Sequence, residues 1–211
     1  MKNLDQIVLA VESAICGGSI SLLKKDVEIA NWIGASNVSK AEDLLVNIDA
    51  LLTSNNISRH EIDLIAVSAG PGSFTGIRIG LATALGLKAG LGVEMSSESA
   101  LKAMVYVTTT AQNVIAAVQA GRNSVCLQEF QIVEQEVRAC DAPRTLTEDA
   151  FFEFVRDEKE ANFILHASLY EKCERSQHIF NFGSNIAQAI GNVCRLHPGY
   201  VTEPLFISKS F

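Results

Sequence analysis

The chain lacks the features of a membrane, exported or nucleic-acid-binding protein. Its longest apolar runs, such as Ile7–Val11, are far shorter than the ~20 residues needed to cross a bilayer. Its first residues carry neither the positive region nor the apolar core of an export signal, so we expect a cytoplasmic location without membrane contact. The 17 basic residues are outnumbered by 24 acidic ones. Because phosphate recognition needs basic surface, we expect nucleic acid to be contacted only through a partner.

Paired metal ligands and disulfide frameworks are also missing. The five cysteines are scattered without a CxxC pair, which indicates reduced thiols: Cys16, Cys126, Cys140, Cys173 and Cys194. None of the four histidines stands four residues from another, so no helical metal pair is expected. Cys16, beside Gly17-Gly18, could act as a nucleophile in a turn. Without an identifiable supporting His or Asp, a half-buried thiol is the favoured interpretation.

The first half of the chain has the pattern strand, strand, strand, helix, strand, helix. Strands are expected at 7–12, 19–23, 27–33 and 64–68. A capping box at Ser39–Glu42 begins an amphipathic helix that ends at Asn55-Asn56, with one apolar face formed by Ala41, Leu44, Leu45, Ile48, Leu51 and Leu52. A short strand at 92–95 and a helix started by Ser96 follow the next helix.

The second half has a shortened version of the strand and helix pattern of the first half. Strands are expected at 114–118, 125–133, 136–140 and 163–165, with a hairpin turn at 121–123. Thr145 and Glu148 are expected to cap a helix that carries Phe151, and the last helix, lined by Ile186 and Ile190, stops at Pro198-Gly199. With 211 residues, 48% of them hydrophobic, the chain can form two α/β lobes, over residues 1–105 and 106–211.

The most informative segment is the glycine motif at 70–80, GPGSFTGIRIG, between a strand and a helix that runs to about Gly90. Gly70-Pro71-Gly72 predicts a sharp turn, and Ser73 can cap the helix. Gly76 and Gly80 continue a stripe of small residues at every fourth position. Since a glycine inside a helix costs roughly 1 kcal/mol relative to alanine, the stripe needs a physical reason.

Two reasons for the stripe are available. Another backbone, in this chain or in a second one, packs unusually close, or a phosphate lies at the helix start. The motif lacks the Lys-Ser/Thr end of a P-loop, and Phe74, Ile77 and Ile79 are apolar. A crossover packed inside its own domain and a helix-to-helix contact with another chain both stay open.

The motif resembles that of the TsaB (YeaZ) family, whose members are partners of TsaD in making threonylcarbamoyladenosine beside the tRNA anticodon. The resemblance is strong over residues 7–104 and thin over 105–200. Further similar segments agree in order and spacing: Val8–Ser13, Glu42–Leu45, Ser58–Ser68 and Glu203–Ile207. The resemblance implies the two-lobed fold of the actin-like ATPase and sugar-kinase superfamily, which is an α/β fold with a mixed sheet in each lobe.

The resemblance also implies a role without independent catalysis. Partners would be a TsaD-like catalytic subunit, a TsaE-like ATPase and, in isolation, a second copy of this chain; ATP or ADP and metal would belong to the partner subunits. The helices around the motif would form the interface, with these candidate residues: Leu44, Leu45, Ile48, Gly72, Phe74, Thr75, Gly76, Ile77, Arg78 and Gly80.

Departures from the family pattern weaken any catalytic role. Where the family has a histidine at the helix start, this chain has Lys40, and where the family's first strand ends in aspartate, this chain has Glu12. The family's Asp-Ala-Arg turn in the second lobe is replaced by Gln119-Ala120-Gly121. An active ATPase of this fold would use an acidic residue after each lobe's first strand to hold Mg²⁺-phosphate. A stand-alone ATPase or phosphotransferase is the second hypothesis, and a peptidase a third that the missing metal ligands argue against.

Overall fold

The first lobe is built on a five-stranded mixed sheet. The computed structural model describes residues 6–35, 43–108, 111–174 and 177–205. In this sheet β1 (Ile7–Glu12) lies between β2 (Ser19–Lys24) and β4 (Leu64–Ser68), with β3 (Val27–Ile33) and β5 (Glu94–Glu98) at the edges. β1 pairs antiparallel with β2 and parallel with β4, and β5 continues the parallel part. All four predicted strands before residue 70 are confirmed.

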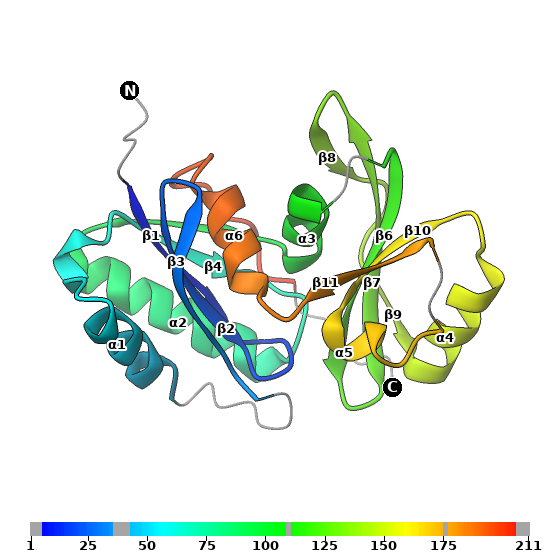
Figure 1. Ribbon diagram of the computed structural model, residues 1–211, viewed down its shortest axis with the longest axis horizontal. Coiled ribbons are helices and arrows are strands. Elements are labelled where there is room, and N and C mark those ends of the chain that lie inside the picture. Colours follow the sequence, from blue (N-terminus) through cyan, green and yellow to red (C-terminus); the bar gives the residue numbers. More distant parts are fainter. Residues whose placement is uncertain (1–5, 36–42, 109–110, 175–176, 206–211) are drawn as a thin grey trace.

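Helices cover both faces of this sheet. α1 (Leu44–Ser54) and α2 (Phe74–Leu91) lie on one face, and α6 (Ile186–Cys194) lies on the other (Figure 1). A short 3-10 turn, η2 (Arg59–Glu61), connects α1 to β4 and is capped by Ser58. Leu9, Val11 and Ile65 turn to the α1/α2 side, whereas Val8, Ala10 and Leu64 turn to the α6 side, as alternation along a strand requires.

The second lobe has its own mixed sheet. β6 (Asn113–Gly121) forms a hairpin with β7 (Ser124–Val133), which also pairs with β8 (Glu136–Ala139) and β9 (Arg144–Thr147). On its other side β6 pairs parallel with β10 (Asn162–His166), followed by β11 (Ile179–Gly183). α4 (Glu148–Asp157) and α5 (Ala167–Tyr170) cover the outer face, and α3 (Ala100–Thr108) lies against the inner one (Figure 1).

α3 and α6 fill the space between the two sheets. One core cluster joins Ala10 of β1, Met104 of α3, Ile190 of α6 and Ala116 of β6. α6 therefore follows the second sheet in sequence but packs on the first, and α3 runs across residue 105. The division of the chain at 105 stays a prediction. Among the described residues, no helix combines the length and apolarity needed to cross a membrane.

Several expected details are corrected. Leu45 is 55% exposed, because α1 buries only one narrow side. Ser96 lies inside β5 and does not start a helix; α3 begins after Ser99, whose Oγ accepts a bond from Lys102 N. Thr147 rather than Thr145 caps α4, since Thr145 is in β9, and the last helix ends at Cys194. β9, β11 and α5 were not expected, and the Ser39–Glu42 box and Ala41 lie outside the described residues.

Candidate functional site

The glycine motif folds as its residue types predict. Gly70 has a φ of +96° in the turn after β4, a backbone conformation suited to glycine. The Ser73 side chain accepts a hydrogen bond from Gly76 N at 3.2 Å and caps α2. At the other end Gly92, with a φ of +69°, terminates the helix. The strand, turn, cap and helix around the motif are thus confirmed.

The glycine stripe of α2 holds the turn that follows β1. A Cβ added at Gly76 would collide with the Ser13 carbonyl oxygen, and one at Gly72 would lie 2.7 Å from Ala14 O. Ser13 Oγ donates to Gly76 O at 2.9 Å, and Ser73 N donates to Ala14 O at 2.8 Å. The close partner of these glycines is therefore a backbone of the same chain and the same lobe.

This arrangement corrects the expectation of a bare glycine face for another chain. Gly72, Gly76 and Gly80 are buried under the Ser13-Ala14 turn, and no free surface is left there. Of the remaining candidates, three are buried in the first lobe: Leu44, Ile48 and Ile77. Four are exposed, and only these can meet a partner directly: Leu45, Phe74, Thr75 and Arg78.

A different side of α2 is open to solvent. Phe74 is 48% and Leu85 53% exposed, and the Arg78 guanidinium lies 3.8 Å from the centre of the Phe74 ring, a cation–π contact. Gly86, the residue after Leu85, is also exposed, and among the described residues nothing lies within 4 Å of a Cβ placed there. Sequence reasoning overlooked Gly86, although a glycine inside the predicted helix was the available signal.

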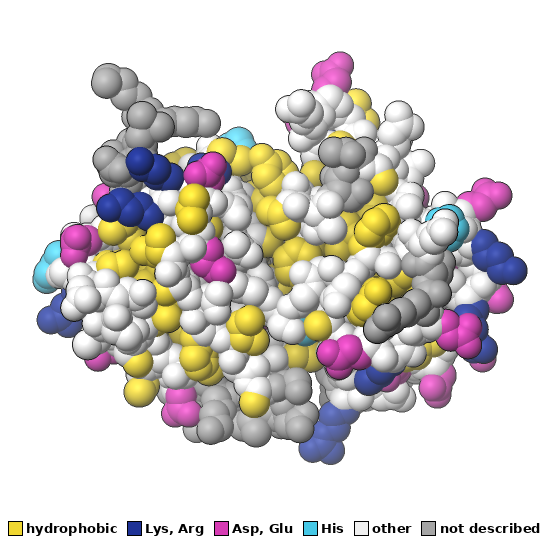
Figure 2. Space-filling model, in the orientation of Figure 1, with side chains coloured by type: hydrophobic (Ala, Val, Ile, Leu, Met, Phe, Trp, Pro, Cys, Tyr) yellow, Lys and Arg dark blue, Asp and Glu magenta, His cyan; other side chains and the backbone are white. Residues whose placement is uncertain are grey.

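The two helices together form what we call the outer face of α1 and α2. It consists of Leu45 and Val46 of α1 and Phe74, Thr75, Arg78, Ala82, Leu85 and Gly86 of α2, all exposed. Figure 2 shows hydrophobic side chains gathered over the first lobe, including the lower end of α1, and along the seam between the lobes. Leu45, Val46 and Leu85 of this face are each more than half exposed, and exposed apolar side chains gathered on one surface are typical of protein–protein interfaces.

The turn after β1 is also where the two lobes meet, and Glu12 lies there. Its side chain is buried, and Oε1 accepts hydrogen bonds from Ala14 N at 2.5 Å and Ile15 N at 2.9 Å. Burial raises the pKa of Glu12 to about 8, partly offset by these two amides. The carboxyl group is occupied by its own backbone rather than directed at an open site.

Cys16 links this turn to the second lobe. Its Sγ lies 3.4 Å from Ser168 Oγ and 3.6 Å from Gln119 Oε1, and Ser168 Oγ lies 3.0 Å from His166 Nδ1. The histidine support that the sequence could not identify is therefore present, through Ser168. Cys16 and Ser168 are 152 positions apart and are brought together only by the packing of the lobes.

The protonation states of this group do not favour nucleophilic chemistry. Burial raises the pKa of the Cys16 thiol and lowers the pKa of His166 to about 4. Near neutral pH the thiol keeps its proton and the imidazole is neutral, whereas a reactive cysteine needs thiolate character. Within the described part of the chain, no three His, Cys, Asp or Glu side chains are placed to hold a metal ion.

Comparisons with known proteins agree on one relationship. The family model of TsaD, tRNA N6-adenosine threonylcarbamoyltransferase, matches residues 37–170. The TsaB protein of Haemophilus influenzae, called a tRNA threonylcarbamoyladenosine biosynthesis protein, is 31% identical over 142 residues, 66% of this chain and 58% of that protein. The matches thus span little more than half the length of the curated relatives.

Solved structures show the same fold. A Pseudomonas aeruginosa protein described as similar to peptidase YEAZ superposes with a TM-score of 0.68 at 19% identity, over 96% of this chain and all of that one. The ethanolamine utilization protein EutJ from Carboxydothermus hydrogenoformans superposes with a TM-score of 0.55 at 10% identity, over 90% of this chain and 89% of that one. The predicted two-lobed actin-like fold is confirmed.

Proposed function

Because the chain belongs to the TsaB (YeaZ) family, we propose that it is a non-catalytic subunit of the complex that attaches threonylcarbamoyl to the tRNA adenosine beside the anticodon. In this role it binds and stabilises a TsaD-like catalytic subunit. The net charge of −7 fits contact with tRNA through the complex rather than directly. Such a subunit works in the cytoplasm.

The observation that carries this proposal is the outer face of α1 and α2. Leu45, Val46 and Leu85 are each more than half exposed, at 55%, 68% and 53%. Gly86 costs the helix about 1 kcal/mol relative to alanine, and none of the residues that the structure describes lies within 4 Å of a Cβ placed there. An exposed glycine beside an exposed leucine is expected where a helix of another protein packs close.

The lobe junction supports a subunit without its own catalysis. The Glu12 carboxyl group accepts bonds from the amides of Ala14 and Ile15, and the second lobe presents Gln119 where a carboxylate would be needed. ATP or ADP and metal then belong to the TsaD-like subunit and to a TsaE-like ATPase. In isolation, we expect the exposed face to be covered by a second copy of this chain.

The proposal is tested by titrating the chain into the TsaD-like protein of the same organism and measuring the heat of binding. We expect a one-to-one complex, weakened at least tenfold by Gly86→Leu or Leu85→Glu because each change obstructs the outer face. Val27→Glu is the matched control, because Val27 is 61% exposed and lies on an edge strand, outside this face. Absence of a complex would refute the proposed function; equal binding by Leu85→Glu and Val27→Glu would refute the interface.

A further inference from the structure

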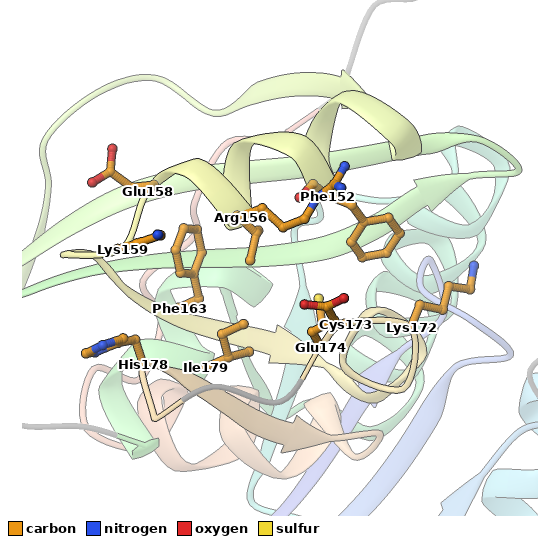
Figure 3. Close-up of a pocket in the computed structure, with 11 residues that line it drawn as sticks. Phe152, Arg156, Glu158, Lys159, Phe163, Lys172, Cys173, Glu174, His178 and Ile179 are labelled. Carbon is orange, nitrogen blue, oxygen red and sulfur yellow. Dashed lines mark hydrogen bonds between the residues drawn. The ribbon is translucent and has the colours of Figure 1, made fainter.

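A cavity of about 520 Å³ lies on the outer side of the second lobe, beside α4 (Figure 3) and in the lobe that does not hold α1 and α2 (Figure 1). α4 and the residues after it form one wall, and β10, the turn after α5 and the start of β11 form the other. This volume is within the range of small-molecule sites, roughly 300–1,000 Å³. No step of the proposed function uses this cavity.

The interior of the cavity is apolar. Phe152 of α4, Phe163 of β10 and Ile179 of β11 project into it (Figure 3), and Val155 of α4 also lines it. Cys173 completes this lining, and burial raises the pKa of its thiol to about 11, so the sulfur behaves as a neutral group at physiological pH. A ligand must therefore bring an apolar or aromatic body of matching size.

The rim on the α4 side is cationic. Arg156 and Lys159 are exposed residues at the cavity, and Arg156 Nε donates to Phe152 O at 3.3 Å, which holds the side chain along the helix. In Figure 3 the Lys159 ammonium is directed toward Phe163, whereas the Glu158 carboxylate points away from the rings. Across the cavity, Lys172 Nζ forms an ion pair with Glu148 Oε1 at 2.6 Å.

Two acidic residues line this space, Glu158 after α4 and Glu174 on the far side. Glu174 disfavours an anion near α5, whereas the Glu158 carboxylate points away from the rings (Figure 3), which leaves the α4 rim as the place for a negatively charged head group. The lining therefore combines an apolar interior with a pair of cations on one side.

We propose that this cavity binds an amphipathic monoanion, a carboxylate with an aromatic ring or a medium-length alkyl chain. Its apolar body lies against Phe152, Phe163 and Ile179, and its carboxylate bonds to the ammonium of Lys159, while Arg156 adds positive charge on the same α4 side. Charge-assisted bonds of this kind are stronger than neutral ones and fix the orientation of the ligand.

The first test uses the fluorescent probe 8-anilinonaphthalene-1-sulfonate, an apolar ring system with one anionic group, and its displacement by decanoate. Decanoate is expected to displace the probe at least tenfold better than decanol, which lacks the charge. In the Arg156→Ala/Lys159→Ala variant this preference should disappear, whereas Lys88→Ala, an exposed lysine of α2, should keep it. Equal displacement by decanoate and decanol in the unchanged protein would overturn the proposal.

The second test places the ligand in the cavity without a mutation that could disturb folding. Decanoate is expected to slow maleimide alkylation of Cys173 at least fivefold and to leave exposed Cys140 unaffected, as followed by mass spectrometry. Val155→Trp, which fills the cavity, should abolish decanoate binding. Unchanged alkylation of Cys173 at saturating decanoate would show that the anion binds elsewhere and would overturn the proposal.

Discussion

Two glycines of the same helix have opposite surroundings, and their replacement by alanine separates the two explanations of the glycine motif. Gly76 lies under the Ser13-Ala14 turn, whereas Gly86 is exposed and a Cβ there would have no described residue within 4 Å. Helix propensity alone predicts that alanine stabilises the protein by about 1 kcal/mol at either position. Any difference between the two variants therefore measures what covers each glycine.

At Gly76 the gain from propensity is outweighed. The new methyl group would strike the Ser13 carbonyl oxygen and lie 2.7 Å from Ala14 Cα, so the turn must move. Overpacking of this kind costs roughly 1–3 kcal/mol. Loss of the 2.9 Å bond from Ser13 Oγ to Gly76 O adds about 1 kcal/mol. When the overpacking and the lost hydrogen bond are set against the gain in helix propensity, we expect Gly76→Ala to lower the free energy of unfolding by roughly 1–3 kcal/mol.

Urea unfolding followed by the fluorescence of the single tryptophan, Trp32, provides the measurement. Trp32 packs beside the α1/α2 side of the first sheet and reports on the affected lobe. Gly86→Ala should raise the unfolding midpoint and Gly76→Ala should lower it, at an unchanged denaturant slope. Equal stabilisation by both changes would show that the turn is not held against the glycine stripe.

The remaining predictions concern titration and helix capping. Since burial raises the pKa of Glu12 to about 8, the folded protein keeps a proton that the unfolded chain loses above about pH 4.5. The free energy of unfolding should therefore fall as the pH rises from 5 to 8, and Glu12→Gln should reduce that fall; identical slopes would contradict the assignment. Thr147→Ala should destabilise the protein by about 1 kcal/mol, because Thr147 Oγ1 accepts a bond from Ala150 N at 3.3 Å. Thr145→Ala serves as its comparison in the same unfolding assay, and an equal effect of both would contradict the cap.

The sequence predicted those features that depend on local pattern. Apolar runs located β1 to β4, and Ser73 with the turn glycines located the start of α2, because strand periodicity and capping act within a few residues. Leu45 was expected on the buried face of α1 but is exposed. The spacing of apolar residues along a helix does not show how wide its buried side is. Thr145 was expected to cap α4, but it pairs with Cys126 of β7 as part of β9, and Thr147 is the cap.

Features that depend on distant segments could not be read from the chain. Ser96 and Ser97 are buried in β5 because residues near the C-terminal end pair with them: Ser97 N donates to Tyr200 O, and Ser96 Oγ accepts from Gly199 N. The spacing of the glycine stripe indicated a close partner, but not that Ser13 and Ala14 of the same lobe are that partner. The contact of Cys16 with Ser168 likewise depends on how the two lobes pack against each other.

The central claim is that this chain is a required, non-catalytic subunit acting through the outer face of α1 and α2. The most direct test reconstitutes tRNA modification from the TsaD-like protein, the TsaE-like ATPase, Mg-ATP, threonylcarbamoyl donor and tRNA, and measures threonylcarbamoyladenosine by mass spectrometry. We expect product with the unchanged chain and with Glu12→Ala, and at least tenfold less with Leu85→Glu or with the chain omitted. Full product in the absence of the chain would contradict the account.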